Sequence, residues 1–365
     1  MFIFHNLAFL LLSAFGIGFI ITYGVIPVII HIAELKHLVD KPNARASHHN
    51  SIPTLGGLGI FIGFILSVTL FTNFKLFPSL QYFLFVMLIG FFLGMKDDVI
   101  ALAPSKKFIG LFLGVTVLVV LGDVRITSFY YLLGIGQLSY FWSVIFSIFT
   151  FLTIVNAVNL IDGINGLCTA TSLISSLAFG IWFLLVGNEV SMQLAILIAG
   201  LIGALLAFLR YNLSPAKIFM GDTGSLLLGV ILAFLAIEFI EINSTYQGPY
   251  NIKTSPVVAM GFLALPLVDM LKVFMIRLYN RTSPFHPDKK HIHHLLLELG
   301  LSHTQATGLL SVLSVLFILL SLVLSQLRAQ TFGMLILVIP LIVVCIPNLL
   351  LRSKYKKSKL QAKQA

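Results

Sequence analysis

The chain has 365 residues, of which 58% are hydrophobic and only 10% are charged. Its mean hydropathy of +1.03 places it among polytopic helical membrane proteins and leaves no stretch for a soluble domain. The formal net charge of +10 does not require nucleic acid as a partner. Basic residues gather on the inner side of membrane proteins, where they also bind an anionic leaflet.

Continuous apolar runs of about 18 to 25 residues predict membrane-spanning helices, because a helix of that length crosses a bilayer. We therefore predict an all-α, multi-pass protein with eleven spans, or ten if the short second and third runs join. Residues 1–351 form one transmembrane domain and 352–365 a basic tail. The first run has neither a basic leader nor a cleavage pattern, so we expect it to be retained. The predicted spans are 6–30, 57–74, 80–95, 107–122, 140–156, 167–186, 192–209, 224–241, 256–279, 304–326 and 331–351.

The distribution of basic residues sets the predicted orientation. With the N-terminus outside, 19 of the 23 Lys and Arg fall in inner segments or in the C-terminal tail, which is then cytoplasmic. This bias also identifies five inner segments, and we expect them to meet at one site on the cytoplasmic face. They are residues 31–56, 94–107, 156–167, 210–223 and 280–303.

The first inner segment reads DKPNARASHHNSIPTLGG from Asp40, and its prolines and glycines predict an irregular loop. Its basic and polar side chains favour a site for an anion. The alternative is a basic loop that only follows the charge rule of membrane proteins. The candidate ligand-binding residues are Asn43, Arg45, His48 and His49.

The second segment, GMKDDVIALAPSKKF, holds the adjacent carboxylates Asp97 and Asp98. Two neighbouring carboxylates repel each other unless a cation lies near them, and Mg²⁺ bound together with phosphate is the usual partner. Lys107 follows nine residues after Asp98 and can close over the same anion. The alternative is an acidic pair at a helix end beside the membrane interface.

The third segment reads NAVNLIDGINGL and carries four polar residues at steps of three, which predicts one face of a helical turn. Gly163 and Gly166 break the helix and let the backbone approach a ligand. A polar strip between two apolar spans is hard to explain by packing, so we interpret it as functional. Its members are Asn156, Asn159, Asp162 and Asn165.

The fourth segment ends in FMGDTGS, directly before an apolar run. Asp222 or its neighbours Thr223 and Ser225 can cap the helix that follows. A helix start is also an anion site. The sequence leaves both interpretations open.

The fifth segment contains DKKHIHH, in which three histidines follow two lysines. No Cys is nearby and the histidine spacing is not one that zinc sites use, so these side chains favour a phosphate or a sugar. The candidates are Lys290, His291, His293 and His294.

One charge lies deeper in a predicted span. Asp269 lies three residues after Pro266, and Lys272 follows one helical turn later. We interpret them as an internal ion pair at a helix that the proline kinks.

Taken in order, these five segments resemble the polyprenyl-phosphate N-acetylhexosamine-1-phosphate transferase family over nearly the whole chain. The resemblance implies an all-helical protein of the bacterial inner membrane with its active site on the cytoplasmic face. Such an enzyme transfers a sugar 1-phosphate from a UDP-N-acetylhexosamine to a polyprenyl phosphate and releases UMP. Its cofactor is Mg²⁺, or Mn²⁺ in its place. The product starts a cell-envelope glycan, and a homodimer is one arrangement open to such a protein.

The first segment resembles the branch that uses UDP-N-acetylglucosamine and undecaprenyl phosphate to start teichoic acid, O-antigen or enterobacterial common antigen. That branch has a PN-x-R-x-x-H pattern before P-x-x-GG, as found here between Pro42 and Gly57. The resemblance therefore favours N-acetylglucosamine as the sugar.

The resemblance also implies roles for single residues. Asp97 and Asp98 match the family's acidic pair and Lys107 matches its lysine, so we expect these three to be catalytic. Asn159 and Asp222 match positions that hold or adjoin Mg²⁺. The other candidates in the first, third and fifth segments are expected to bind substrate.

Two other classes of protein stay open from the sequence. A secondary transporter would use Asp97, Asp98 and Asp269 in a proton path, but transporters place such carboxylates near the membrane midplane. The interpretation of the protein as a lipid-binding scaffold without activity rests on Asn165 alone. Bacterial members of the family commonly have Asp at that position, whereas eukaryotic dolichol-linked members have Asn.

Overall fold

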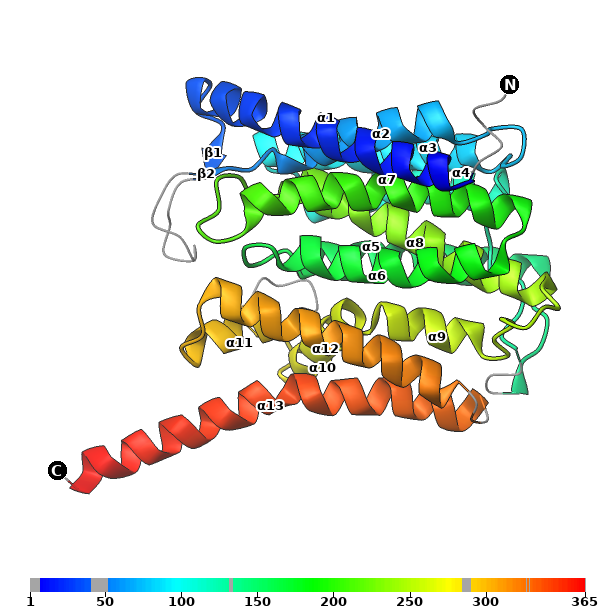
Figure 1. The fold of residues 1–365 in the computed structure, drawn as a ribbon. Coiled ribbons are helices and arrows are strands. Elements are labelled where there is room, and N and C mark those ends of the chain that lie inside the picture. Colours follow the sequence, from blue (N-terminus) through cyan, green and yellow to red (C-terminus); the bar gives the residue numbers. More distant parts are fainter. Residues whose placement is uncertain are drawn as a thin grey trace.

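The computed structural model describes residues 7–40, 52–130, 134–283, 290–325, 327 and 329–364. Nearly all of its regular structure is α-helix, and the helices lie side by side in one bundle (Figure 1). The elements in chain order are α1 (Leu7–Leu35), β1 (Val39–Asp40), β2 (Ile52–Pro53), α2 (Gly56–Phe71), α3 (Leu80–Val99), α4 (Pro104–Val120), α5 (Tyr140–Leu160), α6 (Leu167–Val186), α7 (Glu189–Asn212), α8 (Gly221–Thr245), α9 (Ser255–Phe262), α10 (Ala264–Tyr279), α11 (Ile292–Glu298), α12 (His303–Leu324) and α13 (Ala329–Gln364).

One short hairpin interrupts the helical pattern. Strands β1 and β2 pair antiparallel, with Val39 opposite Pro53 and Asp40 opposite Ile52. The sequence did not predict this pairing. The strands bracket residues 41–51, so four of the predicted anion-binding residues lie outside the described part of the chain. These are Asn43, Arg45, His48 and His49.

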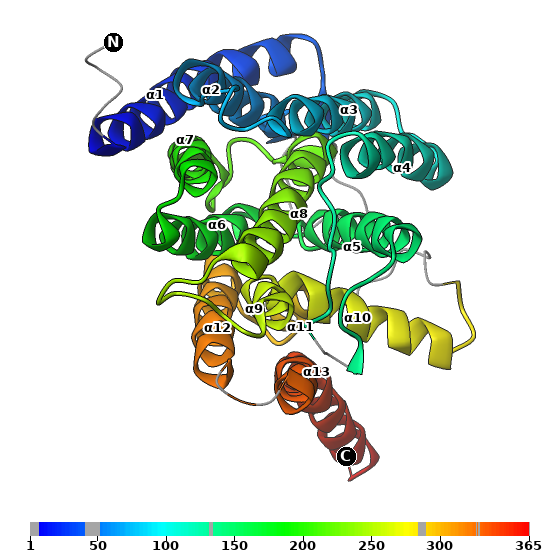
Figure 2. The ribbon, with the colours of Figure 1, turned by 90° about the vertical axis from the view of Figure 1, so that its right-hand side faces the viewer.

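Helix α8 is the centre of the bundle, and Figure 2 shows it crossing the middle of the molecule between α1–α4 and α9–α12. From Leu226 to Ile237 it is apolar on every face, and a helix of that kind is buried on all sides. Phe234, for example, is 0% exposed. It packs against α2, α3, α5 and α6, which fixes the position of its first turn.

Glycine contacts set how closely α2 and α3 approach the first turn of α8. A Cβ on Gly57 of α2 would overlap the backbone nitrogen of Gly224, and a Cβ on Gly94 of α3 would overlap the backbone oxygen of Asp222. The missing side chains therefore let three helix backbones meet at this point. Because Asp97 follows Gly94 by about one helical turn, the contact also brings the acidic pair to the start of α8.

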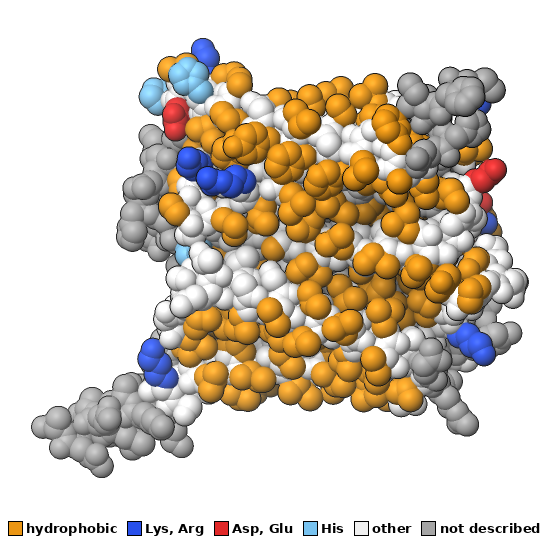
Figure 3. Space-filling model, viewed as in Figure 1, with side chains coloured by type: hydrophobic (Ala, Val, Ile, Leu, Met, Phe, Trp, Pro, Cys, Tyr) orange, Lys and Arg blue, Asp and Glu red, His pale blue; other side chains and the backbone are white. Residues whose placement is uncertain are grey.

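The face of the bundle seen in Figure 3 carries a broad apolar band between two ends that hold charged side chains. Leu12 and Val323 are 71% and 72% exposed, which suits lipid and not water. Seven of the described helices are long and apolar enough to cross a membrane, or eight if α9 and α10 form one bent span. The protein is thus a nearly all-α, multi-pass membrane protein.

The eleven predicted spans correspond to helices, but not all of these qualify as membrane crossings. A helix lies at each predicted segment, the second and third runs are the separate helices α2 and α3, and the ninth is divided into α9 and α10. Helices α2 and α4 have 16 and 17 residues, so they are about 24 to 26 Å long and shorter than the roughly 30 Å hydrocarbon core. The number of crossings and the side that faces the cytoplasm therefore stay predictions.

The bend in the ninth predicted span lies before the proline and not at it. Helices α9 and α10 meet at Leu263 with a bend of 82°, and Pro266 lies in the first turn of α10. Proline has no N–H, so the carbonyl of Phe262, four residues earlier, loses its helical partner. That carbonyl accepts a hydrogen bond from the Ser175 hydroxyl at 2.7 Å instead. This bond stabilises the open end of α9.

Replacing Gly57 by Ala should lower the stability of the protein, because the added Cβ must push α2 away from α8. Overpacking of this kind costs about 1–3 kcal/mol. Gly24→Ala is the matched control, since nothing lies within 4 Å of a Cβ added there. Thermal unfolding in detergent should give a lower midpoint for Gly57→Ala only. Equal midpoints for the two variants would contradict the contact.

Candidate active site at the start of helix α8

Asp98 binds the start of α8 from a neighbouring helix. Its Oδ1 accepts the backbone N–H of Asp222 at 2.8 Å, and its Oδ2 accepts the N–H and the hydroxyl of Thr223 at 2.9 and 2.5 Å. The first N–H groups of a helix have no partner within the helix, and a carboxylate there also faces the positive end of the helix dipole. The cap residue of α8, Met220, makes no side-chain bond. The interpretation that Asp222 or its neighbours cap α8 is therefore wrong, because the cap comes from α3.

Lys107 joins the two remaining carboxylates of the cluster. Its ammonium lies 2.6 Å from Asp97 Oδ2 and also forms an ion pair with Asp222 Oδ2. Asp97 Oδ1 accepts the backbone N–H of Leu102 at 2.5 Å. This bond closes the turn between α3 and α4 and brings Lys107 back over the acidic pair. The three charged side chains are 16–27% exposed, so the cluster is open to a ligand.

Asn159 completes the cluster from the last turn of α5. Its amide nitrogen donates to Asp222 Oδ1 at 3.0 Å and to Ser225 Oγ at 2.8 Å. Both oxygens of Asp222 are therefore held, one by Lys107 and one by Asn159. The structure thus brings together five predicted residues from three inner segments, namely Asp97, Asp98, Lys107, Asn159 and Asp222.

The polar strip of the third segment does not form a single helical face. Helix α5 ends at Leu160, and the chain turns into α6 at Gly166 with a φ of +78°. The prediction that all four polar residues share one helical face is therefore wrong, whereas the predicted break of the helix in this segment is confirmed. Asn156 is exposed and its amide contacts a methionine sulfur of α10 at 3.9 Å, so it does not join the carboxylates. Asn165 is held through its backbone, since its carbonyl accepts the Thr307 hydroxyl at 2.8 Å.

Asp162 lies in the loop after α5, close to the charges of the cluster. Burial raises the pKa of Asp162 to about 8, and the charges of Asp222 and Asp98 act in the same direction. The carboxyl group therefore keeps its proton at neutral pH and can donate a hydrogen bond. The sequence could not distinguish this state from an ionised carboxylate.

The histidines of the fifth segment lie against the third segment. His291 and His293 stack with ring centroids 5.7 Å apart, and the centroids of His293 and His294 are 4.3 Å apart. His293 fits against Gly163, where a Cβ would overlap its Nε2 atom. The sequence predicts that this glycine admits a ligand, whereas the structure uses the space for a histidine. Burial lowers the pKa of His293 to about 3, so its ring is neutral at physiological pH. Lys290 precedes the group and is half-buried.

Backbone hydrogen bonds join residues 52–56, the last part of the first inner segment, to the fourth inner segment. The N–H of Phe219 donates to the carbonyl of Pro53 at 2.8 Å, and the N–H of Gly56 donates to the carbonyl of Phe219 at 2.9 Å. With the contacts above, described parts of all five inner segments meet at one end of the bundle, which is the left end in Figure 1.

Asn212 supports this meeting point, and the sequence interpretation did not include it. Its Oδ1 accepts the N–H of Gly166 at 2.9 Å, and its amide nitrogen donates to the carbonyl of Ile218 at 3.0 Å. It therefore joins the third and fourth segments. The available signal was an Asn in the last turn of an apolar helix, next to a Ser-Pro turn.

The donor set of the cluster suits Mg²⁺. No three His, Cys, Asp or Glu side chains within the described ranges are placed to hold a metal ion. Mg²⁺, however, binds one or two carboxylates and takes its other ligands from water and phosphate. Asp97 and Asp222 both direct an oxygen at the Lys107 ammonium, which marks a position where a cation is held. The amide oxygen of Asn159 is a further donor, so these residues fit Mg²⁺ or Mn²⁺ bound together with a phosphate group.

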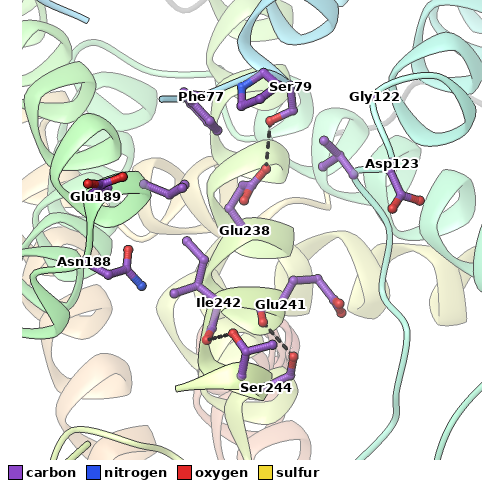
Figure 4. A pocket seen from close by; sticks show the side chains of 14 residues that line it. Phe77, Ser79, Gly122, Asp123, Asn188, Glu189, Glu238, Glu241, Ile242 and Ser244 are labelled. Carbon is purple, nitrogen blue, oxygen red and sulfur yellow. Dashed lines mark hydrogen bonds between the residues drawn. The ribbon is translucent and has the colours of Figure 1, made fainter. Parts of the chain in front are cut away.

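A cavity of about 740 Å³ lies at the other end of α8 (Figure 4). Asp222 and Glu238 are 16 residues apart on this helix, which corresponds to about 24 Å. The lining of the cavity is acidic and would repel a phosphate group, so we do not assign the site there. Its carboxylates are Asp123, Glu189, Glu238 and Glu241.

The fold is that of a multi-pass membrane protein, and comparison with known proteins defines its class as a phospho-sugar transferase. Residues 80–240, which include the whole cluster, match a family profile described as glycosyl transferase family 4. The chain is also 30% identical over 297 residues to an undecaprenyl-phosphate alpha-N-acetylglucosaminyl 1-phosphate transferase of Escherichia coli strain K12. This match covers 78% of the chain and 76% of that protein.

Two further relatives carry the same kind of description. The undecaprenyl-phosphate alpha-N-acetylglucosaminyl 1-phosphate transferase of Salmonella typhimurium is 31% identical over 285 residues, covering 75% of this chain and 73% of the relative. A probable undecaprenyl-phosphate N-acetylglucosaminyl 1-phosphate transferase of Bacillus subtilis strain 168 is 29% identical over 323 residues, covering 86% and 84%. The chain belongs to the polyprenyl-phosphate N-acetylhexosamine-1-phosphate transferase family, and the resemblance seen in its five inner segments is confirmed.

The stability of the protein should fall as the pH rises from about 5 to about 8, in part because of Asp162. In that window the folded state keeps a proton that the unfolded chain releases, since the folded pKa lies above the usual value for Asp. Asp162→Asn cannot ionise, so its thermal midpoint in detergent should fall less steeply across the same window. The same slope in both proteins would show that Asp162 is ionised in the folded state.

Proposed function

We propose that the protein transfers N-acetylglucosamine 1-phosphate from UDP-N-acetylglucosamine to undecaprenyl phosphate and releases UMP. Relatives matched over about three quarters of the chain are described by transfer of this sugar phosphate. The observation that carries the proposal is the cluster of Asp97, Lys107 and Asp222 at one end of an apolar bundle. A lipid phosphate can reach such a site from the membrane surface while its tail stays in the bilayer.

The main physical difficulty of this reaction is to bring two anions together. A phosphate monoester has a second pKa of about 6, so the lipid phosphate is mostly dianionic at pH 7 and needs no strong base. In phosphoryl transfer, positioning and charge stabilisation supply most of the catalysis. Lys107 contributes a positive charge at the centre of the cluster. Asp97, its ion-pair partner, can accept the remaining proton of the lipid phosphate.

Asn159 and Asp222 are proposed to hold Mg²⁺, or Mn²⁺ in its place, with Asp97 beside them. When bound, the ion would screen the charge of the reacting phosphates. Asp98, which the resemblance implies to be catalytic, is proposed instead to have a positioning role, because its oxygens accept hydrogen bonds from the backbone of the first turn of α8. The oxygens of Asp222 are bonded instead to side chains, those of Lys107 and Asn159. Asp98 keeps Asp222 in place and does not need to touch the substrate.

The fifth segment is proposed to bind the nucleotide sugar. Lys290 contributes positive charge, and the half-buried His294, which packs against His293, offers a hydrogen bond. The protonated carboxyl of Asp162 adds a donor from the third segment. The first-segment candidates belong to the same proposal, because β2 is bonded to the fourth segment next to the cluster. The full set is Asn43, Arg45, His48, His49, Asn156, Asp162, Asn165, Lys290, His291, His293 and His294.

The site is proposed to face the cytoplasm across a bacterial inner membrane, since most Lys and Arg lie in the inner segments. The lipid-linked sugar would start O-antigen, teichoic acid or a related envelope polysaccharide. A transporter is not favoured, because Asp97, Asp98 and Asp222 lie at helix ends. Asp269 is bound by Lys272 and a histidine, which leaves it unsuited to a proton path.

Purified protein incubated with radiolabelled UDP-N-acetylglucosamine, undecaprenyl phosphate and Mg²⁺ should form labelled lipid and release UMP in equal amounts. Chelation with EDTA should stop the reaction, and added Mg²⁺ should restore it. Parallel reactions with UDP-N-acetylgalactosamine test the choice of sugar. If neither labelled lipid nor UMP appears with any UDP-sugar, the proposed transfer is wrong.

Lys107→Met should lower the initial rate of UMP release by about two orders of magnitude, because removing one preorganised group that stabilises developing charge costs about 2.7–4 kcal/mol. Lys106→Met is the matched control, since this neighbouring side chain is exposed and should keep a nearly normal rate. A similar loss in both variants would assign the effect to net charge and not to the cluster.

A further inference from the structure

A carboxylate outside the cluster binds a helix start in the same way as Asp98. Asp269 and Lys272 of α10 are each only 1% exposed, and Lys272 Nζ lies 2.9 Å from Asp269 Oδ1. The predicted internal ion pair is thus present. A buried pair by itself contributes little stability, because desolvation of both charges offsets their attraction. The other partners of the carboxylate therefore decide what the pair does.

Both further partners of Asp269 belong to the start of α11. Its Oδ1 accepts the N–H of Ile292 at 2.8 Å, and its Oδ2 lies 2.8 Å from His291 Nδ1. Ile292 is the first residue of α11, and the cap residue His291 makes no side-chain cap bond. Asp269 therefore supplies the cap of α11 from α10.

The contacts of His291 continue to the candidate active site. Its ring is 5% exposed and stacks on the ring of His293 with 9° between the two planes. His293 in turn fills the space beside Gly163, the residue after Asp162. A displacement at Asp269 is thus transmitted through packed groups to the loop beside the carboxylate cluster.

We infer that Asp269 is a positioning residue for the nucleotide-sugar half of the site, acting through His291 and the start of α11. The inference rests on the proposed function. The carboxylate accepts the Nδ1–H of His291 and so fixes the orientation of the ring, as carboxylates do for histidines that bind ligands. Lys272 balances the charge of the carboxylate where water is excluded.

Asp269→Asn tests this role because the amide keeps the shape of the side chain but can present an N–H₂ group to His291. The Nδ1–H of His291 then meets a donor in place of an acceptor, and the contact that orients the ring is lost. The single variant also leaves Lys272 as a buried and unpaired charge, which can prevent folding. The double variant Asp269→Asn/Lys272→Met removes both charges and keeps the site neutral.

We expect the double variant to insert and to unfold at nearly the wild-type temperature, because replacing a buried ion pair by uncharged groups is often neutral. Its KM for UDP-N-acetylglucosamine should rise by about tenfold, which corresponds to the loss of one charge-assisted hydrogen bond. The KM for undecaprenyl phosphate should stay unchanged. Asp123→Asn is the matched control, since this side chain is 71% exposed at the opposite end of the bundle and should leave both constants unchanged.

If Asp269 has only a structural role, a double variant that is as stable as the wild type should have the wild-type KM for both substrates. That result would overturn the inference. Calorimetric titration with UDP-N-acetylglucosamine separates the inference from the proposed reaction. If the wild type forms no labelled lipid but binds this nucleotide sugar more tightly than the double variant, the transfer reaction fails and the role of Asp269 stands. Equal binding by the two proteins, or none by the wild type, would overturn the role of Asp269.

Discussion

The carboxylate of Asp98 at the first turn of α8 is the contact on which the rest of the site depends. A helix start presents N–H groups that need an acceptor, and here α3 provides it. Hydrogen bonds to a charged group contribute about 1.5–3 kcal/mol each, and leaving a buried N–H unpaired costs a similar amount. The bond fixes Asp222 relative to the last turn of α3. Asp97 and Lys107 then meet Asp222 because the turn into α4 returns the lysine over the same point.

Asp98 and Asp269 accept N–H groups at helix starts, as cap residues do, but each belongs to a different helix from the one it caps. The acceptor comes from α3 for α8 and from α10 for α11. A local cap stabilises only its own helix, whereas a cap from another helix also fixes how the two helices are placed. That arrangement suits a site whose parts come from distant segments. The acidic residues therefore fall into two groups. Asp98 and Asp269 fix the relative positions of helices, whereas Asp97 and Asp222 face the open side of the cluster.

The apolar runs predicted the helices well, because a backbone that crosses a bilayer has few alternatives to the α-helix. The charge distribution also indicated that Asp97, Asp222 and Asn159 belong to one end of the bundle, where the structure brings them together. Contacts between segments could not be predicted in this way. Asp222 next to a helix start suggests a local cap, since local capping is the common case. Steps of three fit both a helix and a loop, and only the end of α5 at Leu160 decides between them.

Helix α8 differs from its neighbours in having almost no surface of its own. Within its apolar stretch 89% of the residues are buried, compared with 28% in α1 and 33% in α12. Lipids with longer or shorter chains press only on helices that they touch, and such helices respond by tilting. The outer helices therefore absorb changes in bilayer thickness, while the first turn of α8 keeps its geometry. Asp222 is therefore shielded from such changes, whereas Lys107 and Asn159 lie on helices with exposed apolar side chains and follow the bilayer more closely.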